Sequence, residues 1–228
     1  MLRDTHKKLG FTIVELLVVI VTLGILLVVT YVAWGGISTR AFNLNILNSM
    51  TAYKNAFEIY ANQEHTYPTV PATGNYCLQT SAFTSAEVNA IDPSTHLPST
   101  ITAQGITETA YYCREIAWEP QRHAGYPPLN KALASVASVP SGQDNGKKQQ
   151  VDSSSGGVFV LYDSDPNDST KTRITIKGMM KGQTCPSGTV QSWVSTSGSP
   201  KTICQITLQK TYPTTFTGEA WPYAGTID

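Results

Sequence analysis

An uncharged apolar run near the start of the chain constrains the fold more than any other feature. Residues 16–34 are Leu, Val, Ile, Gly, Ala and Thr, with one Tyr and one Trp near the end. As an α-helix, which rises 1.5 Å per residue, such a stretch is about 28 Å long, close to the roughly 30 Å hydrocarbon thickness of a bilayer. The sequence therefore predicts a helix that can cross a membrane once.

The charges around the run predict its orientation. Arg3, Lys7 and Lys8 precede it against one acid, Asp4, and the next basic residue is Arg40. Positive residues favour the cytoplasmic side, so we expect the N-terminus inside and the rest of the chain outside. A cleaved signal peptide has an apolar region of about 7 to 15 residues and a small-residue cleavage site. This run is longer and shows no obvious Ala-x-Ala site, which favours retention in the membrane.

One acid, Glu15, stands at the start of the apolar run. A carboxylate within the apolar part of a membrane helix costs about 2.5 to 3.5 kcal/mol on insertion scales. It can lie at the helix start, reach the cytoplasmic interface and interact favourably with the helix dipole. It can also serve a function inside the membrane, which is the usual reason for an acid there. Both interpretations are open on these grounds.

The residues around Glu15 resemble the N-terminus of type IV pilins and type II secretion pseudopilins. In that family a short basic leader ends in Gly, a Phe follows, and a Glu is the fifth residue of the mature chain. Here these residues are Gly10, Phe11 and Glu15. The resemblance is close over residues 7–20, includes a helix glycine at Gly24 and is looser beyond it.

The resemblance implies processing and assembly. A prepilin peptidase would cut between Gly10 and Phe11 and methylate the new amine of Phe11. In the family, the glutamate of an incoming subunit, here Glu15, meets the amine of Phe11 on the subunit already at the filament base. Because an unpaired charge in lipid is costly, such a pair would set the register of the subunits.

The function implied is that of a structural filament subunit, without catalytic activity, metal or cofactor. Its partners would be further copies or pilin co-subunits, the prepilin peptidase, a membrane assembly platform and, before assembly, membrane lipid. The head would act in adhesion, motility, DNA uptake or secretion on a surface pilus, or the chain would be a pseudopilin of a type II secretion system. The alternative is a signal-anchored surface protein whose head binds a ligand or acts as an enzyme. A net charge of zero argues against nucleic acid as a general partner.

The composition changes sharply at Pro68, since all 13 prolines and all 4 cysteines lie at or after it. The resemblance and this change predict the α+β type IV pilin fold, in which a long helix packs against an antiparallel sheet. The expected divisions are a cleaved leader at 1–10, a membrane or filament-core helix at 11–34, an amphipathic continuation at 35–66 and an outward-facing head at 67–228.

The helix is expected to continue to about Glu64. The family's helix proline is replaced by Val32, so we expect a weak spot in the helix at Gly35 and Gly36. Beyond it, one stripe at helical spacing should pack under the head: Phe42, Ile46, Met50, Tyr53, Phe57 and Tyr60. A stripe on roughly the opposite side should contact neighbouring helices: Ile37, Ala41, Leu44 and Leu47.

In the head, β-branched and aromatic content predicts five strands, at 110–118, 157–163, 172–180, 189–195 and 202–209. The last four favour an antiparallel meander laid on the aromatic stripe. The stretches 68–109 and 119–156 are expected to be rich in loops, with short helices such as one at 130–139.

Four cysteines in an outward-facing head imply two disulfides. Three pairings are possible, and we favour Cys77 with Cys113 and Cys185 with Cys204, because each closes a local loop. No Cys-x-x-Cys occurs, and the spacings do not suit zinc.

The remaining candidates are weaker. Residues 163–168 begin like a calcium loop but lack its glycine and its final glutamate, so a polar hairpin turn is preferred. Basic residues on one strand favour a solvated face over DNA capture; they are Lys171, Arg173, Lys177 and Lys181. His65, His96 and His123 have no acid or cysteine at a useful spacing, so no catalytic site is expected.

Overall fold

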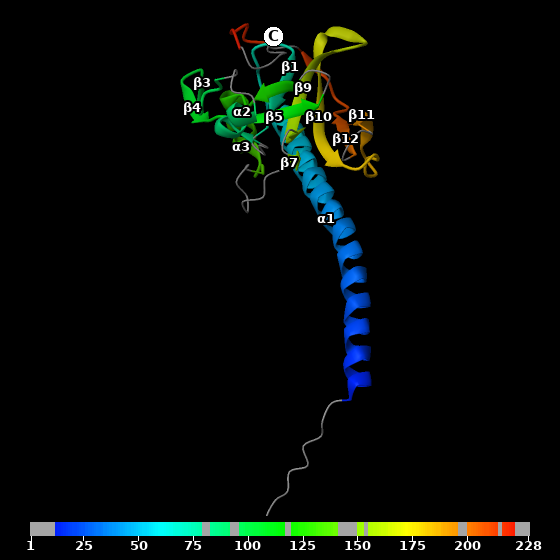
Figure 1. Cartoon of the computed structure of the whole chain (residues 1–228). Coiled ribbons are helices and arrows are strands. Elements are labelled where there is room, and N and C mark those ends of the chain that lie inside the picture. The colour runs from blue at the N-terminus through cyan, green and yellow to red at the C-terminus, as the bar shows by residue number, and fades with distance from the viewer. Residues whose placement is uncertain are drawn as a thin grey trace, which may run out of the picture. The chain divides into compact units, whose positions relative to one another are not determined.

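The computed structural model describes residues 12–78, 83–91, 96–116, 120–140, 150–152, 155–195, 200–213 and 216–221. The chain divides into two compact units, Met1–Ala41 and Phe42–Asp228. Helix α1 (Ile13–Glu64) contributes to both units and ends at Glu64 (Figure 1). Its backbone is helical through Gly35 and Gly36, so the expected weak spot is not a break in this helix.

The larger sheet of the second unit has six antiparallel strands, as expected for the α+β type IV pilin fold. The strands in spatial order are β1 (Gly74–Cys77), β9 (Val158–Asp165), β10 (Asp168–Lys181), β12 (Lys201–Thr207) and β11 (Val190–Ser195), with β13 (Tyr212–Pro213) paired to β10. The hairpin of β9 and β10 turns at Pro166 and Asn167, and Ile176 lies opposite both Val160 and Ile206. A long helix with an antiparallel sheet is therefore the architecture of the chain.

The strand order corrects the expected meander. A meander would place β11 beside β10, whereas β12 lies between them. Because β10 and β11 both run antiparallel to β12, they are parallel to each other, and residues 182–189 must carry the chain back along the sheet. Cys185 in this returning segment is joined to Cys204 of β12. Strand spacing in the sequence does not distinguish such a return from a simple turn.

The two stretches expected to be loop-rich contain more regular structure than that. Residues 68–109 hold β1, β2 (Phe83–Thr84), α2 (Ser85–Ile91), β3 (Thr100–Ala103) and β4 (Ile106–Thr109). Residues 119–156 hold β6 (Pro120–Ala124), α3 (Pro127–Val136), β7 (Gln150–Asp152) and β8 (Ser155–Gly156). The helix expected at 130–139 thus begins three residues earlier, at the proline pair that suits the first turn of a helix.

The hairpin of β3 and β4 shows why one of these stretches was misjudged. Its turn residues, Gln104 and Gly105, have φ angles of 48° and 75°, the positive values that a tight two-residue hairpin turn requires. Threonine alternates with Ile and Ala in β3 and with Ile and Glu in β4, and this short pattern is the signal that could have identified the hairpin.

A second sheet joins the first through β1. Its order is β2, β5 (Tyr111–Ile116), β8 and β7, with β6 paired to β5. Cys77 of β1 makes an isolated parallel bridge to Gly125 and a disulfide to Cys113 of β5. One backbone bridge and one covalent bond therefore tie the two sheets together at the same residue.

The main core lies between the second half of α1 and the larger sheet. Ile46, Met50, Tyr53 and Phe57 of the predicted stripe are all buried, with Phe42 and Tyr60 half-buried at its ends. Of the opposite stripe, Ile37 and Leu44 are 65% and 55% exposed, as expected, and Leu47 differs because it packs against the core.

Gly178 of β10 lies directly beneath the helix. A Cβ atom at this position would lie 2.5 Å from Met50 Sδ and 2.6 Å from Ile46 Cγ2. These separations are shorter than any van der Waals contact, so a residue without a side chain is required for the helix to approach the sheet this closely.

Candidate functional site: an unpartnered apolar helix with a capped glutamate

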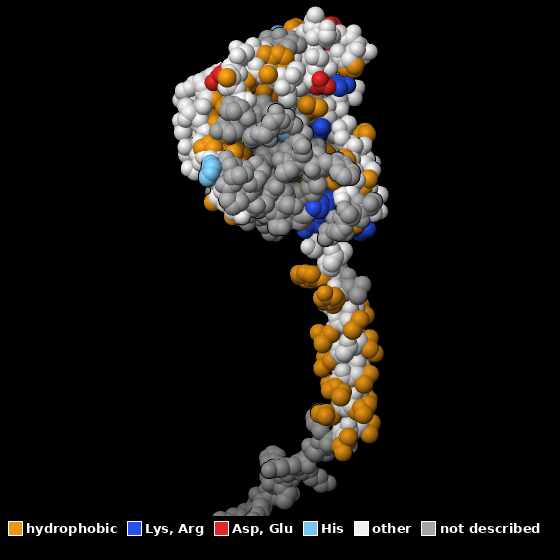
Figure 2. Space-filling model, turned by 45° about the horizontal axis from the view of Figure 1, so that its top comes forward, with side chains coloured by type: hydrophobic (Ala, Val, Ile, Leu, Met, Phe, Trp, Pro, Cys, Tyr) orange, Lys and Arg blue, Asp and Glu red, His pale blue; other side chains and the backbone are white. Residues whose placement is uncertain are grey.

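The apolar part of α1 has no partner within the described chain. Every described side chain from residue 12 to residue 38 is exposed, from 48% for Val19 to 85% for Ile13 among the large apolar ones. Figure 2 shows hydrophobic side chains along this part of the helix. Among the described residues, α1 is the one helix that is long and apolar enough to cross a membrane. Such a continuous apolar surface requires lipid or other apolar helices around it.

The threonine hydroxyl groups at Thr22 and Thr30 of this segment form hydrogen bonds with the backbone of their own helix. The Thr22 hydroxyl donates to the carbonyls of Val18 and Val19, at 3.0 and 2.9 Å, and the Thr30 hydroxyl donates to the carbonyl of Leu26 at 2.7 Å. Because lipid offers no hydrogen bonds, this back-bonding lowers the cost of placing the hydroxyls there. Residues 16–34 of the helix are therefore chemically suited to an apolar environment.

Glu15 lies in the first turn of α1 and forms a capping box with Thr12. The Glu15 Oε2 atom accepts hydrogen bonds from the backbone N–H and the hydroxyl of Thr12, both at 2.9 Å, and the Glu15 N–H donates to Thr12 Oγ1 at 3.2 Å. A capping box satisfies two backbone donors that a helix start leaves unpaired, and the helix dipole favours a negative charge at this end. The structure thus holds the carboxylate at the helix start.

The capping box occupies one carboxylate oxygen only. All hydrogen bonds to the Glu15 carboxylate from described residues go to Oε2, which leaves Oε1 for a partner. A cationic amine is a suitable one, because charge-assisted hydrogen bonds are the stronger kind. Gly10 and Phe11, the expected cleavage site and amine donor, lie outside the described residues. Sequence reasoning missed Thr12, although the spacing Thr-x-x-Glu before an apolar run is the signal for this cap.

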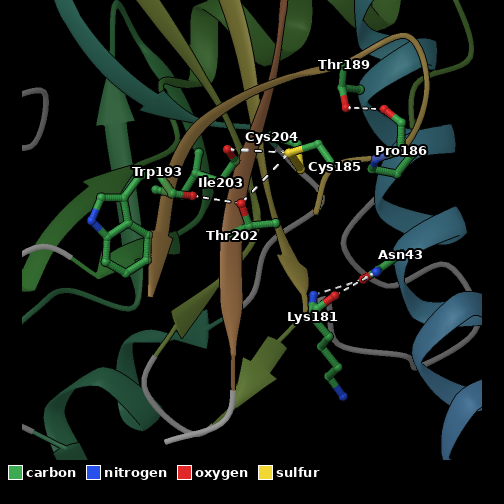
Figure 3. The surroundings of a disulfide bond; sticks show 9 residues. All are labelled: Asn43, Lys181, Cys185, Pro186, Thr189, Trp193, Thr202, Ile203 and Cys204. Atoms are coloured by element: carbon green, nitrogen blue, oxygen red, sulfur yellow. Dashed lines mark hydrogen bonds between the residues drawn. A yellow bond between two sulfur atoms is a disulfide. The ribbon is translucent and has the colours of Figure 1, made fainter. Parts of the chain in front are cut away.

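The four cysteines form the two disulfides that loop length favours. Cys77 is bonded to Cys113, with their Cα atoms 5.3 Å apart, and Cys185 to Cys204, at 5.6 Å. Figure 3 shows Cys185 reaching β12 from the returning segment, with its sulfur 3.9 Å from Thr202 Oγ1. Both bonds fasten strands of the head and lie outside the apolar segment of α1.

The acidic turn of β9 and β10 is a hairpin, as preferred from the sequence. Asp163 pairs with Arg173 and Asp168 with Lys171, both at 3.0 Å, while Asp165 Oδ1 accepts a hydrogen bond from the Asn167 N–H. Hydrogen bonds from Thr170 and Lys171 lower the pKa of Asp168 to about 2. Among the described residues no three His, Cys, Asp or Glu side chains gather to hold a metal ion.

The histidines considered as catalytic candidates are spread over separate elements. His65 follows the end of α1, His96 precedes β3, and both are exposed. His123 in β6 is buried, with its ring 5.5 Å from that of Phe159.

A small cavity of about 250 Å³ lies at the end of α1 in the head. Its wall includes Tyr67, whose hydroxyl donates to the Lys210 carbonyl at 2.5 Å, and Lys210, whose ammonium donates to Asn62 Oδ1 at 3.0 Å. Burial raises the pKa of the Tyr67 hydroxyl well above its usual value. The hydrogen bonds therefore join the wall residues to one another. The cavity lies where the end of α1 packs against residues 208–212.

Comparison with known proteins gives one informative similarity. The chain is 34% identical over 68 residues to the type II secretion system core protein G of Escherichia coli strain K12. The matched stretch is 30% of this chain and 47% of that protein, so the chain spans about half the length of the curated relative it matches. No family model matches the chain, and no solved structure matches it. The chain is thus a distant relative of a secretion-system protein, with a helix and sheet of the pilin type.

Proposed function

We propose that the chain is a structural subunit of a filament of the type IV pilus and type II secretion class. The observation that carries this proposal is Glu15, a carboxylate at the start of a helical segment, residues 12–38, in which the Thr22 and Thr30 hydroxyls bond the helix backbone and every described side chain is exposed. A simple anchor has no need of such an acid. The resemblance of residues 7–20 and the relative in the type II secretion system support the same class.

In this proposal the chain is made as a precursor with its N-terminus in the cytoplasm. A prepilin peptidase cuts between Gly10 and Phe11 and methylates the Phe11 amine. The mature subunit stays in the membrane through the apolar part of α1 until an assembly platform adds it to the filament. The head then lies outside the cytoplasmic membrane, and the subunit has no catalytic activity of its own.

Assembly depends on the free oxygen of Glu15. In the proposed step, Oε1 of an incoming subunit accepts a charge-assisted hydrogen bond from the Phe11 amine of the subunit ahead of it, while Oε2 keeps its bonds to Thr12. The capping box holds the carboxylate in one position, so less conformational freedom is lost when the pair forms. Uncut precursors lack the Phe11 amine and are therefore not extended.

The secretion pseudopilus is the more specific candidate, because the curated relative is named as a core protein of the type II secretion system. A surface pilus, with the head acting in adhesion, motility or DNA uptake, is the other member of the class. Antibodies to the head distinguish them: labelling along surface filaments supports a pilus, and a secretion defect on deletion without surface filaments supports a pseudopilus.

The direct test replaces Glu15 with Val in cells that contain the processing and assembly proteins. We expect normal insertion and normal cleavage, measured as the intact mass of a mature chain starting at methylated Phe11, with filament assembly lost. Val14→Leu is the matched control, because it changes a neighbouring exposed side chain without touching the carboxylate. Normal filaments from the Glu15→Val variant, or a wild-type chain that keeps residues 1–10, would contradict the proposal.

A further inference from the structure

The cavity at the end of α1 has a buried floor and a polar rim. Ala61, Tyr67 and Leu208 of its wall are buried, whereas Gln209 and Lys210 of the same wall are exposed. An apolar and aromatic floor with a few polar groups at the opening is the usual form of a small-molecule binding site. Every wall residue belongs to the second unit, Phe42–Asp228, so the cavity lies wholly within that unit.

The floor of the cavity is held in place by contacts within the head. The Tyr67 ring meets the Tyr212 ring edge to face, with the ring centres 5.0 Å apart. The Tyr67 hydroxyl donates to the Lys210 carbonyl at 2.5 Å, and the Leu208 N–H donates to the Ile174 carbonyl at 2.9 Å. Because the fold already fixes these groups, little conformational freedom would be lost when a ligand enters.

The rim keeps hydrogen-bonding groups that the described chain does not use. The Lys210 ammonium donates one hydrogen bond to Asn62 Oδ1 at 3.0 Å and has further N–H groups to offer. The side chains of Gln209 and Tyr212 form no hydrogen bond with another described residue, and neither does the amide nitrogen of Asn62. Donors and acceptors are therefore available side by side around the opening.

The charges of the wall balance. Glu58 supplies one carboxylate and Lys210 one ammonium, and the wall has no other charged residue. The Glu58 carboxylate lies 3.4 Å from the Lys54 ammonium through Oε1, and Oε2 accepts no hydrogen bond from a described residue. A charged ligand is costly to bury unless opposite charge surrounds it. The balance instead favours a neutral ligand that both donates and accepts hydrogen bonds.

The volume of the cavity limits the size of that ligand. It is about 250 Å³, below the roughly 300 to 1,000 Å³ of pockets that hold drug-sized molecules. One small ring fits such a space better than a long chain. A pyranose sugar has the matching chemistry, because its hydroxyl groups both donate and accept and its C–H face can pack against an aromatic ring.

We propose that this cavity is a binding site for one neutral sugar unit, either a free monosaccharide or the terminal unit of a glycan. The C–H face of the sugar packs on Tyr67 and Tyr212, and its hydroxyl groups bond with Glu58, Gln209 and Lys210. The inference goes beyond the proposed function and does not depend on it, because one copy of the head holds the complete site. In a filament, repetition of the site would raise the overall affinity for a glycan-covered surface.

The test uses the full chain in phosphatidylcholine nanodiscs, whose lipids carry no sugar. Saturation-transfer NMR detects the binding of methyl glucoside, methyl galactoside and methyl mannoside, and titration gives the Kd of each. We expect at least one of them to bind with a Kd on the order of 1 mM, as suits a ligand of this size. Glycerol, which has hydroxyl groups but no ring, should bind at least tenfold more weakly.

Two variants test where the sugar binds. Tyr212→Phe removes a hydroxyl group and keeps the ring against Tyr67, while Gln209→Ala removes an exposed amide. Each should raise the Kd about two- to tenfold, the effect of losing one neutral hydrogen bond. Gln63→Ala should leave the Kd unchanged, because Gln63 is an exposed glutamine of the same helix end outside the wall. If Tyr212→Phe fails to fold, Gln209→Ala still gives the readout.

The outcomes separate this inference from the proposed function. Absence of saturation transfer to every neutral sugar, or binding that both variants leave unchanged, would overturn the inference and leave the filament subunit unaffected. Tighter binding of glucosamine or glucuronic acid would assign the cavity to a charged ligand and overturn it as well. Preference for the methyl glycoside over the free sugar supports a terminal glycan unit, and the reverse supports a free monosaccharide. A chain that binds the sugar but forms no filaments would contradict the proposed function alone.

Discussion

The two parts of helix α1 use apolar side chains in opposite ways. In the first unit, the described apolar side chains lie on all sides of the helix and are exposed. In the second unit, Met50, Tyr53 and Phe57 are buried at helical spacing while Leu44 and Ile59 on other sides are exposed. The difference shows that hydrophobicity by itself does not indicate burial within a chain. A helix that is apolar all round needs partners from outside, whereas an amphipathic one can be covered by its own sheet.

Glycines of the two units differ in the same way, as Gly24 in α1 and Gly178 in β10 show. A Cβ atom on Gly24 would meet nothing within 4 Å, whereas on Gly178 it would collide with Met50 and Ile46. Contacts within the chain therefore explain Gly178 and leave Gly24 unexplained. Small residues allow close approach of neighbouring helices in a membrane, so in the proposed assembly Gly24 would allow such an approach between subunits.

The largest expected effect comes from removing a core ring. Phe57→Ala should lower the free energy of unfolding of the head by about 3 to 5 kcal/mol, because it leaves a cavity beside Tyr67 and Tyr162. Leu26→Ala, which removes an exposed apolar side chain from the same helix, should leave it unchanged. Denaturant unfolding of the full chain in detergent, followed by tyrosine and tryptophan fluorescence, measures both. Similar losses for the two variants would show that both parts of the helix contribute alike to the stability of the head.

Removing one disulfide should have the next largest effect. The double variant Cys185→Ser and Cys204→Ser should lower the free energy of unfolding by about 3 kcal/mol in the same measurement. The reason is that the disulfide closes a loop between cysteines 19 residues apart in the sequence. Membrane insertion should be unaffected, since the bond lies in the head. A variant with altered membrane insertion and an unchanged free energy of unfolding would contradict this prediction, because it would mean that the disulfide acts on the membrane segment and not on the stability of the head.

Substitution of the two glycines should give changes of opposite sign. Gly178→Ala should destabilise the head by about 1 to 3 kcal/mol, because the added methyl group overlaps Met50. Gly24→Ala should instead favour the helix by up to about 1 kcal/mol. Thermal unfolding of the head measures the first, and helix content of a peptide covering residues 12–41 in detergent measures the second. A head that tolerates Gly178→Ala without loss would show that the helix can shift away from the sheet.

The smallest expected effect depends on pH. Asp168 has its pKa lowered to about 2 from 3.8 in the fold, so its contribution to stability is present above pH 3.8 and is lost as the pH falls toward 2. Asp168→Asn should therefore flatten the dependence of the melting temperature on pH in this window. The apolar part of α1 should show no such dependence on Asp168. An unchanged pH profile in the variant would indicate that the carboxylate is equally well stabilised in the unfolded chain.

Much of the helix was predictable, because its signals are local. The uncharged run identified the apolar segment, and the stripe from Phe42 to Phe57 identified the face that is buried against the sheet. The strands β9, β10, β11 and β12 also lie where β-branched residues predict them. Thr12 was missed although its capping signal, a threonine three residues before Glu15, is local.

The rest depends on contacts distant in sequence. Nothing near Gly178 in the chain indicates that a helix more than a hundred residues earlier crosses it, and the glycine could equally have marked a bulge. The position of β12 between β10 and β11 follows from the returning segment 182–189, whose path is visible only in three dimensions. Lys181 and Lys201 likewise become neighbours only through that register.

The strand order has a consequence for the sequence of events in folding. β11 pairs with β12 and with no other described strand, and β12 pairs in turn with β10. As the chain is made, β11 emerges first but has no strand to pair with until β12 has followed it. This edge strand of the larger sheet can therefore join the sheet only with β12 or after it, and an interruption between residues 195 and 201 would leave both β10 and β11 without their common partner.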